Sequence, residues 1–366
     1  MSTESHTMNE TTWVPFSILK PFVFDAFKSI GVLQADAETC RDVLLDADLK
    51  GLDTHGVNRL KPFYYDRVLA GKQKPVTDLT VIREGPTTTV MDANNGMGMV
   101  AAHKAMETAI AKAKEYGMGM AVVRNSTHFG IAGYYAEMAS KQGLMGMCGT
   151  NARPAIAPTF GVEPMLGTNP LTFSFPTDEN FPFTLDCATS IIQRGKVEVA
   201  SREEKLLPDG LIIDNNNQYM NEPTKTLEAM LKGEAALLPL GGAGEETSGY
   251  KGYGYATVVE ILSSALQQGF FLRAINGVNI GHFFLAIDVE AFTALDDFKK
   301  TTGSILRELR SARKVPGQPR IYTAGEKEYL TSLERRTKGV PVTAGVQREL
   351  VEIRDQQGLD YRFPFE

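Results

Sequence analysis

Residues 88–149 read TTVMDANNGMGMVAAHKAMETAIAKAKEYGMGMAVVRNSTHFGIAGYYAEMASKQGLMGMCG, and this stretch decides the fold. Short apolar runs alternate in it with longer segments of helical periodicity, and Gly117 and Gly143 close the helical segments. The expected elements are strands over 88–92, 118–123 and 144–149 and helices over 101–116 and 131–142. This β-α-β-α-β order predicts an α/β domain.

Helical periodicity also covers the chain on the N-terminal side of this stretch. Apolar stripes run through residues 15–50, and a third helix is expected from Thr54 to Gly71. On the C-terminal side the pattern predicts strands over 171–175, 183–185 and 282–288 and helices over 196–203, 255–268 and 294–318. Residues 207–250 are looser and rich in glycine, proline and asparagine. We interpret the basic residues of 294–318, among them Arg307 and Arg310, as a solvated helix face.

Length, charge and cysteine content narrow the class of protein. A chain of 366 residues predicts two domains, or one large domain with an added unit. The net charge of −6 argues against a general nucleic-acid binder, and no apolar run reaches the roughly 18 residues that span a membrane. Residues 1–12 lack a basic and an apolar segment, so we expect a frayed tail and no secretion signal. The widely spaced Cys40, Cys148 and Cys187 lack zinc-site spacing and fit reduced thiols in the cytoplasm.

Two of the five histidines stand in short polar motifs. The first is THGVNR, residues 54–59, in which His55 and Arg59 share a face if the segment is helical. An imidazole can move a proton at a hydroxyl or carbonyl oxygen while a guanidinium binds a carboxylate in a two-point fork. This pairing suits a 2-hydroxy or 2-oxo acid, and the alternative is a surface helix that carries both residues by chance. The second motif, RNSTHFG over 124–130, holds His128.

Glycine-rich turns offer two candidate nucleotide sites. GMGMVA, residues 96–101, fits the dinucleotide pattern G-x-G-x-x-A between an expected strand and helix. The turn before it is longer than the pattern needs, and Arg124 stands near the position of an acidic ribose ligand, which favours a plain glycine turn. The loop from Gly241 to Gly252 contains Lys251 beside many glycines and suits an anion or a cofactor, although a structural loop is the alternative.

Asp186 lies at the end of the strand pattern in LDCATS, residues 185–190. A carboxylate at a strand end can orient a histidine from elsewhere in the fold. The alternative is a helix N-cap, because Thr189 and Ser190 also resemble a helix start.

Seven segments together resemble one family. They are THGVNRL (54–60), STHFGIAGYYAEMA (126–139), GTNPLTFSFPT (167–177), LDCATS (185–190), SGYKGYGYA (248–256), GHFFLAID (281–288) and TAGEKEY (323–329). Their residues and order are similar to those of the malate/L-lactate/L-sulfolactate dehydrogenase family. This NAD(P)-dependent family includes ureidoglycolate dehydrogenase and 2,3-diketogulonate reductase and is unrelated to the usual lactate and malate dehydrogenases. The likeness covers about residues 15–345.

The resemblance implies an α/β fold that is not a Rossmann fold. A central mixed-sheet domain (81–293) would bind the cofactor, a helical domain would combine both chain ends (13–80 with 294–345), and 346–366 would be a C-terminal extension. GMGMVA would then be a glycine turn and not a nucleotide-binding site. The resemblance also implies a homodimer, NAD or NADP as cofactor, and malate or oxaloacetate as the first-choice substrate. The alternatives are lactate, sulfolactate, ureidoglycolate or a cyclic imine acid, or a non-catalytic nucleotide-binding role.

The same resemblance implies roles for single residues. His55 would donate the proton in ketone reduction, Asp186 would pair with it and favour the imidazolium, Arg59 would bind the substrate carboxylate, and His128 would line the substrate and nicotinamide pocket. The stretches that match cofactor contacts are Leu185, Asp186, Cys187, Ala188, Thr189, Ser190 and Ile191, then Tyr250 and Lys251, then Gly325, Glu326 and Lys327. A dicarboxylate needs a second cation, for which the candidates are Arg124, Arg153 and Lys251.

Overall fold

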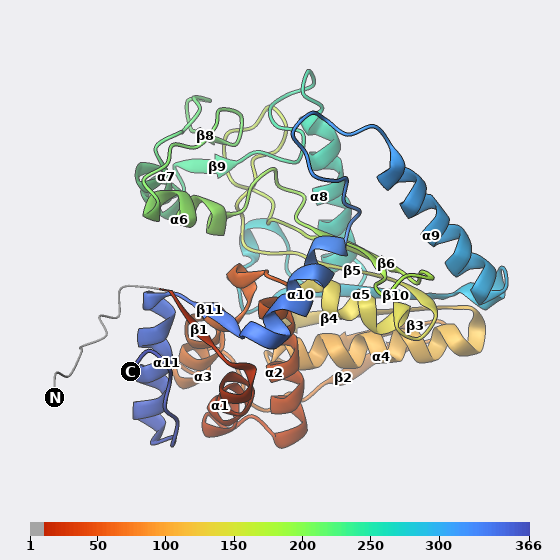
Figure 1. The fold of residues 1–366 in the computed structure, drawn as a ribbon, viewed down its shortest axis with the longest axis horizontal. Coiled ribbons are helices and arrows are strands. Elements are labelled where there is room, and N and C mark those ends of the chain that lie inside the picture. Colours follow the sequence, from red (N-terminus) through yellow and green to blue (C-terminus); the bar gives the residue numbers. More distant parts are fainter. Residues whose placement is uncertain (1–10) are drawn as a thin grey trace.

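The computed structural model describes residues 11–366, which form an α/β fold around a seven-stranded sheet (Figure 1). The strands lie in the order β2-β3-β4-β10-β5-β6-β7. Their bounds are β2 Thr80–Glu84, β3 Thr88–Asp92, β4 Met118–Ser126, β5 Leu144–Thr150, β6 Leu171–Phe175, β7 Phe183–Cys187 and β10 Ile280–Asp288. β3 and β4 are parallel, and the other neighbouring strands of this sheet are antiparallel. Because a Rossmann sheet is mostly parallel, the predicted fold class, mixed and non-Rossmann, is confirmed.

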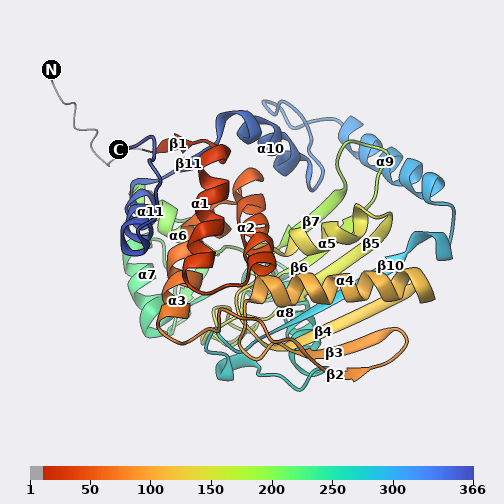
Figure 2. The same ribbon diagram turned by 90° about the horizontal axis from the view of Figure 1, so that it is seen from below.

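Helices cover both faces of the sheet, and the strand side chains alternate between these faces. α4 (Gly98–Tyr116) and α5 (Ala132–Ser140) lie on one face, and α8 (Gly249–Ser264) lies on the other (Figure 1, Figure 2). Phe284 of β10 joins the core with α4 and α5, whereas its neighbour Phe283 packs with the apolar side chains of α8. The middle of the sheet is therefore buried on both faces, and its strands can carry loops that build a site at their ends.

The two ends of the described chain meet in a helical layer beside the sheet. β1 (Thr12–Val14) pairs antiparallel with β11 (Val340–Val342). The helices of this layer are α1 Phe16–Ser29, α2 Gln34–Leu49, α10 Glu326–Lys338 and α11 Ala344–Gln357. Phe363 packs edge-on against Phe22 of α1, so the C-terminal segment shares the core of the N-terminal helices. Thr12, which we expected in the tail, is paired in β1, and residues 1–10 lie outside the described residues.

Residues 53–69 form a series of short turns instead of the single helix that the periodicity predicted. The turns are the 3₁₀ turns η1 Asp53–His55 and η2 Val57–Arg59, the π-helical turn η3 Leu60–Tyr65 and the short helix α3 Asp66–Leu69. The break falls at Gly56, whose ψ is −143°. The buried Asp48 carboxylate accepts the Val57 amide at 2.9 Å and would clash with any Cβ at position 56. A contact from α2 thus overrides the local helical preference.

Residues 194–237 form a small lobe whose apolar core also includes Ile156, Leu166 and Ala256. Its elements are α6 Arg194–Arg202, β8 Ile212–Asp214, α7 Pro223–Lys232 and β9 Ala235–Leu237. β8 and β9 pair antiparallel, and Ile212 and Leu237 are buried in the lobe. The sequence predicted α6 but neither strand, because three residues are too few to show an alternating pattern.

The remaining elements of the described chain are α9 Leu295–Ser311 and the 3₁₀ turns η4 Leu272–Ala274 and η5 Val289–Ala291. α8 begins at Gly249, earlier than the predicted Tyr255, and its glycines allow the helix to lie against the neighbouring backbone. A Cβ on Gly252 would lie 2.2 Å from the Leu240 carbonyl oxygen. None of the helices that the structure describes is long and apolar enough to cross a membrane.

Candidate active site

Two adjoining cavities form an elongated groove beside the helical layer. The His55 cavity has a volume of about 210 Å³, and its lining includes Thr54, His55, Arg59, Thr168, Gln193 and Arg194. The Gly325 cavity has a volume of about 300 Å³, and its lining includes Lys50, Glu137, Leu185, Tyr322, Gly325 and Lys327. Leu52, Ile131 and Asp186 line both cavities, so the two cavities adjoin at these residues.

His55 ends the η1 turn with one ring nitrogen bound to its neighbour. Nδ1 of His55 lies 2.9 Å from the Thr54 hydroxyl, which leaves Nε2 for a ligand in the cavity. Burial, and then the positive charge of Arg59, lowers the pKa of His55 to about 4. The imidazole is therefore uncharged at neutral pH, and Nε2 can accept a proton when Nδ1 carries the ring hydrogen.

His128 stacks on His55 and is held in one tautomer. The ring centroids lie 5.7 Å apart, with 22° between the ring planes. The Gly130 amide donates to Nδ1 of His128 at 3.3 Å, so this nitrogen is an acceptor and the Tyr64 hydroxyl, 2.6 Å away, donates to it. The proton of the neutral His128 ring then lies on Nε2. Burial lowers the pKa of His128 well below its usual value, and the surrounding positive charges lower it further.

Arg59 is fixed by backbone and ring contacts while its terminal amino groups stay open. Its Nε donates to the Thr54 carbonyl oxygen at 2.5 Å, and its guanidinium lies 4.8 Å from the centre of the Phe63 ring. Arg67 lies over the same ring at 4.6 Å. Within residues 11–366 the two Nη atoms of Arg59 have no hydrogen bond or ion pair, so they are free to bind a carboxylate. His55 and Arg59 therefore line one cavity even though they do not share one regular helix.

Asp186 lies at the junction of the two cavities but makes no hydrogen bond with His55 in the described chain. Its Oδ2 accepts the Gly133 amide at 2.7 Å, and its Oδ1 accepts the Thr172 hydroxyl at 2.9 Å. Burial raises the pKa of Asp186, although these two donors oppose the shift. The expected shift of His55 toward the imidazolium is wrong, because burial and Arg59 act on the imidazole in the opposite direction.

Some of the residues expected at the cofactor line the groove, and the others do not. Those that line it are Leu185, Asp186, Ala188, Gly325 and Lys327. Those that line neither cavity are Cys187, Thr189, Ser190, Ile191, Tyr250, Lys251 and Glu326. Thr189 donates its amide and its hydroxyl to the Thr168 carbonyl oxygen, so the second half of LDCATS secures a loop of the His55 cavity. Tyr250 and Lys251 lie at the start of α8, where the ammonium is 5.7 Å from the ring centre.

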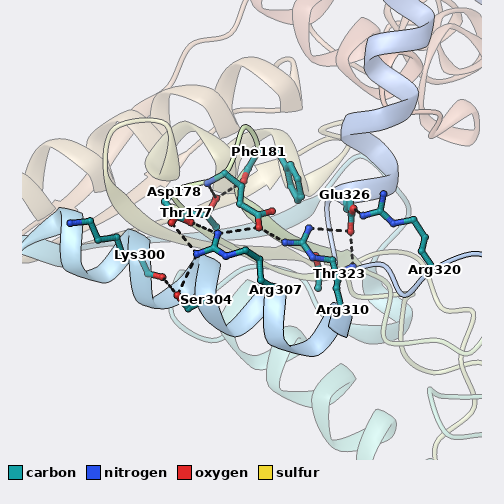
Figure 3. A network of polar contacts seen from close by, with 11 residues as sticks. Thr177, Asp178, Phe181, Lys300, Ser304, Arg307, Arg310, Arg320, Thr323 and Glu326 are labelled. Atoms are coloured by element: carbon teal, nitrogen blue, oxygen red, sulfur yellow. Dashed lines mark hydrogen bonds and ion pairs between the residues drawn. The ribbon is translucent and has the colours of Figure 1, made fainter. Parts of the chain in front are cut away.

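Glu326 lies between Gly325 and Lys327 in the chain but is not among the residues that line the groove, and its carboxylate points toward Arg310 and Arg320 (Figure 3). Its carboxylate is nearly buried and contacts Arg310 and Arg320. One of its oxygens also accepts the Thr323 amide at 3.2 Å. The expectation that Glu326 touches the cofactor is therefore replaced by a supporting role beneath the residues that line the Gly325 cavity.

The same ion-pair network ties α9 to the turn between β6 and β7 (Figure 3). Arg307 binds Asp178 at 2.9 Å, and Arg310 contacts Glu179. The interpretation of the α9 basic residues as a purely solvated face is thus wrong for these two arginines. Their partners lie far away in the sequence, so helical spacing alone gave no signal. The Arg307–Asp178 pair is exposed, and such pairs contribute only about 0–1 kcal/mol each, whereas Arg310, Glu179 and Glu326 are mostly buried.

The structure adds residues to the groove that the sequence analysis did not find. Lys50 lies 2.7 Å from Asp46 and 2.9 Å from Glu137, and it lines the Gly325 cavity. The spacing of Asp46 and Lys50 on α2 is a helical pair spacing, but nothing in the sequence connects them to Glu137. Arg194 reaches the His55 cavity from the start of α6, a helix that we predicted without assigning it a function.

The GMGMVA turn packs internally. The Met97 amide donates to the Thr77 hydroxyl at 3.0 Å, and the Gly98 amide donates to the Thr127 hydroxyl at 2.9 Å. A Cβ on Gly98 would lie 2.1 Å from the Thr127 carbonyl oxygen. These glycines therefore allow α4 to approach the loop before His128, and their amides are not available to a pyrophosphate.

The thiols of the described chain are all unpaired. Burial raises the pKa of Cys40 and Cys148 well above the usual value, and it raises that of Cys187 as well. Within residues 11–366 no group of three or more His, Cys, Asp or Glu side chains is placed to hold a metal ion.

Comparisons with known proteins agree with the fold. Residues 14–351 match the model of the malate/L-lactate dehydrogenase family. The chain is 42% identical to the malate dehydrogenase of Pyrococcus horikoshii over 352 residues, which cover 95% of this chain and 96% of that protein. It is 36% identical to the L-sulfolactate dehydrogenase of Methanocaldococcus jannaschii, over 94% of this chain and 98% of that protein. The crystal structure of malate dehydrogenase from Entamoeba histolytica matches with a TM-score of 0.95 and 44% identity, covering 97% of this chain and 100% of that chain.

The fold, the groove and these likenesses define a hydroxy acid dehydrogenase, an enzyme that acts on a small hydroxy or oxo acid. This class of enzyme implies a nicotinamide cofactor. The chain belongs to the malate/L-lactate dehydrogenase family.

Proposed function

We propose that this enzyme interconverts malate and oxaloacetate with NAD or NADP, and that His55 moves the proton. One observation carries the proposal: His55 and Arg59 line one cavity, and a second cavity adjoins it at Asp186. The choice of malate is supported by the likeness to malate dehydrogenases at 42% and 44% identity, against 36% for the sulfolactate enzyme.

In this proposal Arg59 binds the C1 carboxylate through its two Nη atoms and directs the C2 oxygen at Nε2 of His55. During oxidation Nε2 takes the hydroxyl proton, and during reduction it returns this proton to the carbonyl oxygen. The nicotinamide, when bound, accepts or supplies the hydride. Because the substrate carboxylate offsets the charge of Arg59, substrate binding raises the pKa of His55 from about 4 toward neutrality. His128, which the sequence placed in the pocket, lines neither cavity, and in this proposal it acts by packing against the His55 ring.

The Gly325 cavity fits a nicotinamide cofactor in the chemistry of its walls. Leu185 and Tyr322 offer apolar surface, and the ammonium group of Lys327 offers charge for phosphates, whereas Lys50 is already paired with Asp46 and Glu137. The buried Thr323 hydroxyl has no hydrogen-bond partner in residues 11–366. We propose that Lys327 and Thr323 bind the cofactor and that Leu185 and Tyr322 flank it.

We also propose that the enzyme is a homodimer that covers the outer face of α8. The solvent-exposed apolar side chains on and just after this helix are Tyr255, Val258, Ile261, Leu266, Phe270 and Phe271. A cavity of about 730 Å³ opens on the same face, beside Tyr253 and Ile261. Apolar patches of this kind mark protein–protein contacts in soluble proteins. Tyr250 and Lys251, which line neither cavity of the groove, lie at the start of the same helix.

The test of the proposed function is a substrate and cofactor panel. Oxidation of NADH and of NADPH by the purified enzyme is measured with oxaloacetate, pyruvate, a ureido acid and a cyclic imine acid, and kcat/KM is compared. The highest value for oxaloacetate supports the proposal. A higher value for another 2-oxo acid keeps the mechanism and changes the substrate, and turnover of the imine or ureido acid alone contradicts the choice of a 2-oxo acid.

Arg59→Lys is expected to raise KM for the oxo acid by about tenfold or more while kcat changes less. Lysine keeps the charge but loses the planar fork that binds a carboxylate at two points, and a charge-assisted hydrogen bond contributes about 1.5–3 kcal/mol. Steady-state kinetics with saturating cofactor measure this change. Arg202→Lys, on the exposed side of α6, is the matched control. An unchanged KM in the Arg59 variant would show that the substrate carboxylate binds elsewhere.

The two directions of the reaction are expected to respond oppositely to pH. Oxidation needs neutral His55, whose pKa is about 4 in the free enzyme, so kcat/KM for malate stays level above about pH 5 and falls as pH drops through 4. Reduction needs the protonated ring, so kcat/KM for oxaloacetate decreases as pH rises above this pKa. Profiles of kcat/KM against pH in both directions check the sign. A common inflection near the unperturbed pKa of about 6.5 would contradict the effect of burial and Arg59 on His55.

A further inference from the structure

A second guanidinium lines the His55 cavity, and the chemistry described so far gives it no task. Arg194 comes from the first position of α6 and shares the cavity with Arg59. We propose that Arg194 binds a second anionic group at the far end of the substrate and so makes the enzyme select dianionic 2-oxo and 2-hydroxy acids. This inference rests on the proposed function and adds the residue that distinguishes such acids from singly charged ones.

The position of Arg194 is set by close packing between α6 and the segment that carries His55. A Cβ on Gly195, the next residue, would lie 2.8 Å from Cγ2 of Thr54. Glycine at this position therefore lets the first turn of α6 lie directly against the residue before His55. The consequence is that Arg194 enters the cavity from the side of the lobe, whereas Arg59 enters from η2.

The Arg194 side chain is positioned and still has free donors. Its Nε donates to Glu198 at 3.1 Å, one turn along the same helix. Neither Nη atom of Arg194 has a hydrogen bond or ion pair in residues 11–366, so both can bind an oxyanion. Arg194 and Glu198 also lie close enough to Arg59 for both charges to act on its pKa: burial lowers this pKa most, Glu198 opposes the shift, and Arg194 adds to it. Binding a second anion would relieve this repulsion between the two guanidinium groups.

The three cations that the sequence offered for this task are placed elsewhere. Arg124 binds Asp92 at 2.8 Å and the Gln267 carbonyl oxygen, and it does not line the cavity. Arg153 packs against Gly277 near Arg67. Lys251 lies over the Tyr250 ring at the start of α8. In the described chain, Arg59 and Arg194 are the arginines that line the cavity with His55, and no lysine joins them there.

Two arginines on one cavity match an acid with an anionic group at each end. A carboxylate or a sulfonate at C3 would satisfy Arg194, because both present oxygens to a planar fork. The shared chemistry is a second oxyanion, and measurement decides whether it is a carboxylate or a sulfonate.

The experiment compares kcat/KM for oxaloacetate, 3-sulfopyruvate and pyruvate in the wild-type enzyme and in Arg194→Gln, Arg194→Lys and Arg202→Gln. We expect Arg194→Gln to lose about 10–100-fold with the preferred dianionic acid and to keep its pyruvate activity, because only the second anion loses its partner. Arg194→Lys should recover part of the loss, and Arg202→Gln, on the same helix but outside the cavity, should match the wild type. The larger of the two dianion effects identifies the carboxylate or the sulfonate as the second group.

Two results would overturn the inference. An equal loss with pyruvate and with the dianionic acids would show that Arg194 acts on the whole site, and no loss with any substrate would show that it does not touch the ligand. Retained pyruvate turnover shows that the Arg194→Gln variant is folded. A wild-type enzyme that prefers pyruvate contradicts the malate proposal itself, whereas a dianion preference that survives in Arg194→Gln contradicts only the role of Arg194.

Discussion

Replacement of His55 by glutamine is expected to lower kcat by about 10²–10⁴-fold in both directions while cofactor affinity stays within a small factor of the wild type. Glutamine can keep the hydrogen bond to the Thr54 hydroxyl but cannot carry the proton between hydroxyl and solvent. Hydride transfer is then no longer accompanied by proton transfer through His55. Steady-state kinetics give the loss in kcat, and a fluorescence titration with NADH and NADPH gives cofactor affinity separately.

The matched control for this prediction is His103→Gln. His103 lies on α4 and pairs with Glu107 at 3.3 Å, outside both cavities of the groove. We expect this variant to keep full activity. Normal turnover in His55→Gln would remove His55 from the chemistry and leave His128, which stacks on it, as the next candidate.

Gly56→Ala is expected to lower both the activity and the stability of the enzyme. The new Cβ would lie 1.8 Å from Oδ1 of the buried Asp48, which is itself bound to the Val57 amide. Forcing a methyl group into a packed interior costs about 1–3 kcal/mol of stability, and a shift of about 1 Å at a catalytic group can cost 10²-fold in rate. Because Gly56 directly follows His55, we expect kcat to fall about 10²-fold together with a lower Tm.

Gly345→Ala serves as the control for this steric prediction. Gly345 lies in α11, where an added Cβ meets no atom within 4 Å. Alanine has the higher helix propensity, so this variant should be unchanged or slightly more stable. A Gly56→Ala enzyme with normal kcat and Tm would show that the Asp48 carboxylate moves aside and does not fix the turn that carries His55.

The alternation of strands and helices could be predicted from the sequence because their signals are local. β3 and β6 have the predicted bounds, and β4, β5 and β10 contain the predicted strands. The helical prediction failed between Thr54 and Gly71 because the decisive group, the Asp48 carboxylate, belongs to α2. The periodicity of a segment does not reveal a buried partner that belongs to another element.

The candidate site was predicted in part, and its electrostatics were not. His55 and Arg59 line one cavity. The pKa of His55 depends on its burial and on how close the Arg59 charge lies, and neither can be read from the sequence. Asp186 reaches the groove as expected and binds the Gly133 amide and the Thr172 hydroxyl instead of the imidazole. Whether a carboxylate meets a histidine depends on which donors the neighbouring strand and helix present to it.

Arg194 and Glu326 show that sequence motifs alone do not predict which charged residues face the groove. Arg194 stood in no motif that we singled out, yet α6 brings it to the cavity. Glu326 stood in a motif that implies cofactor contact, yet its carboxylate is occupied by Arg310 and Arg320 behind the groove. The side on which a charged residue lies follows from the packing of whole elements.

The measurement that tests the account most directly is a crystal structure of the enzyme with its nicotinamide cofactor and tartronate, a 2-hydroxy dicarboxylate that resembles the substrate. The account predicts one tartronate carboxylate on the Nη atoms of Arg59 and the hydroxyl within hydrogen-bond distance of Nε2 of His55. It also predicts the nicotinamide ring beside them at the junction marked by Asp186. Tartronate bound outside the His55 cavity, or bound with its hydroxyl directed away from His55, would contradict the assignment of this groove as the catalytic site.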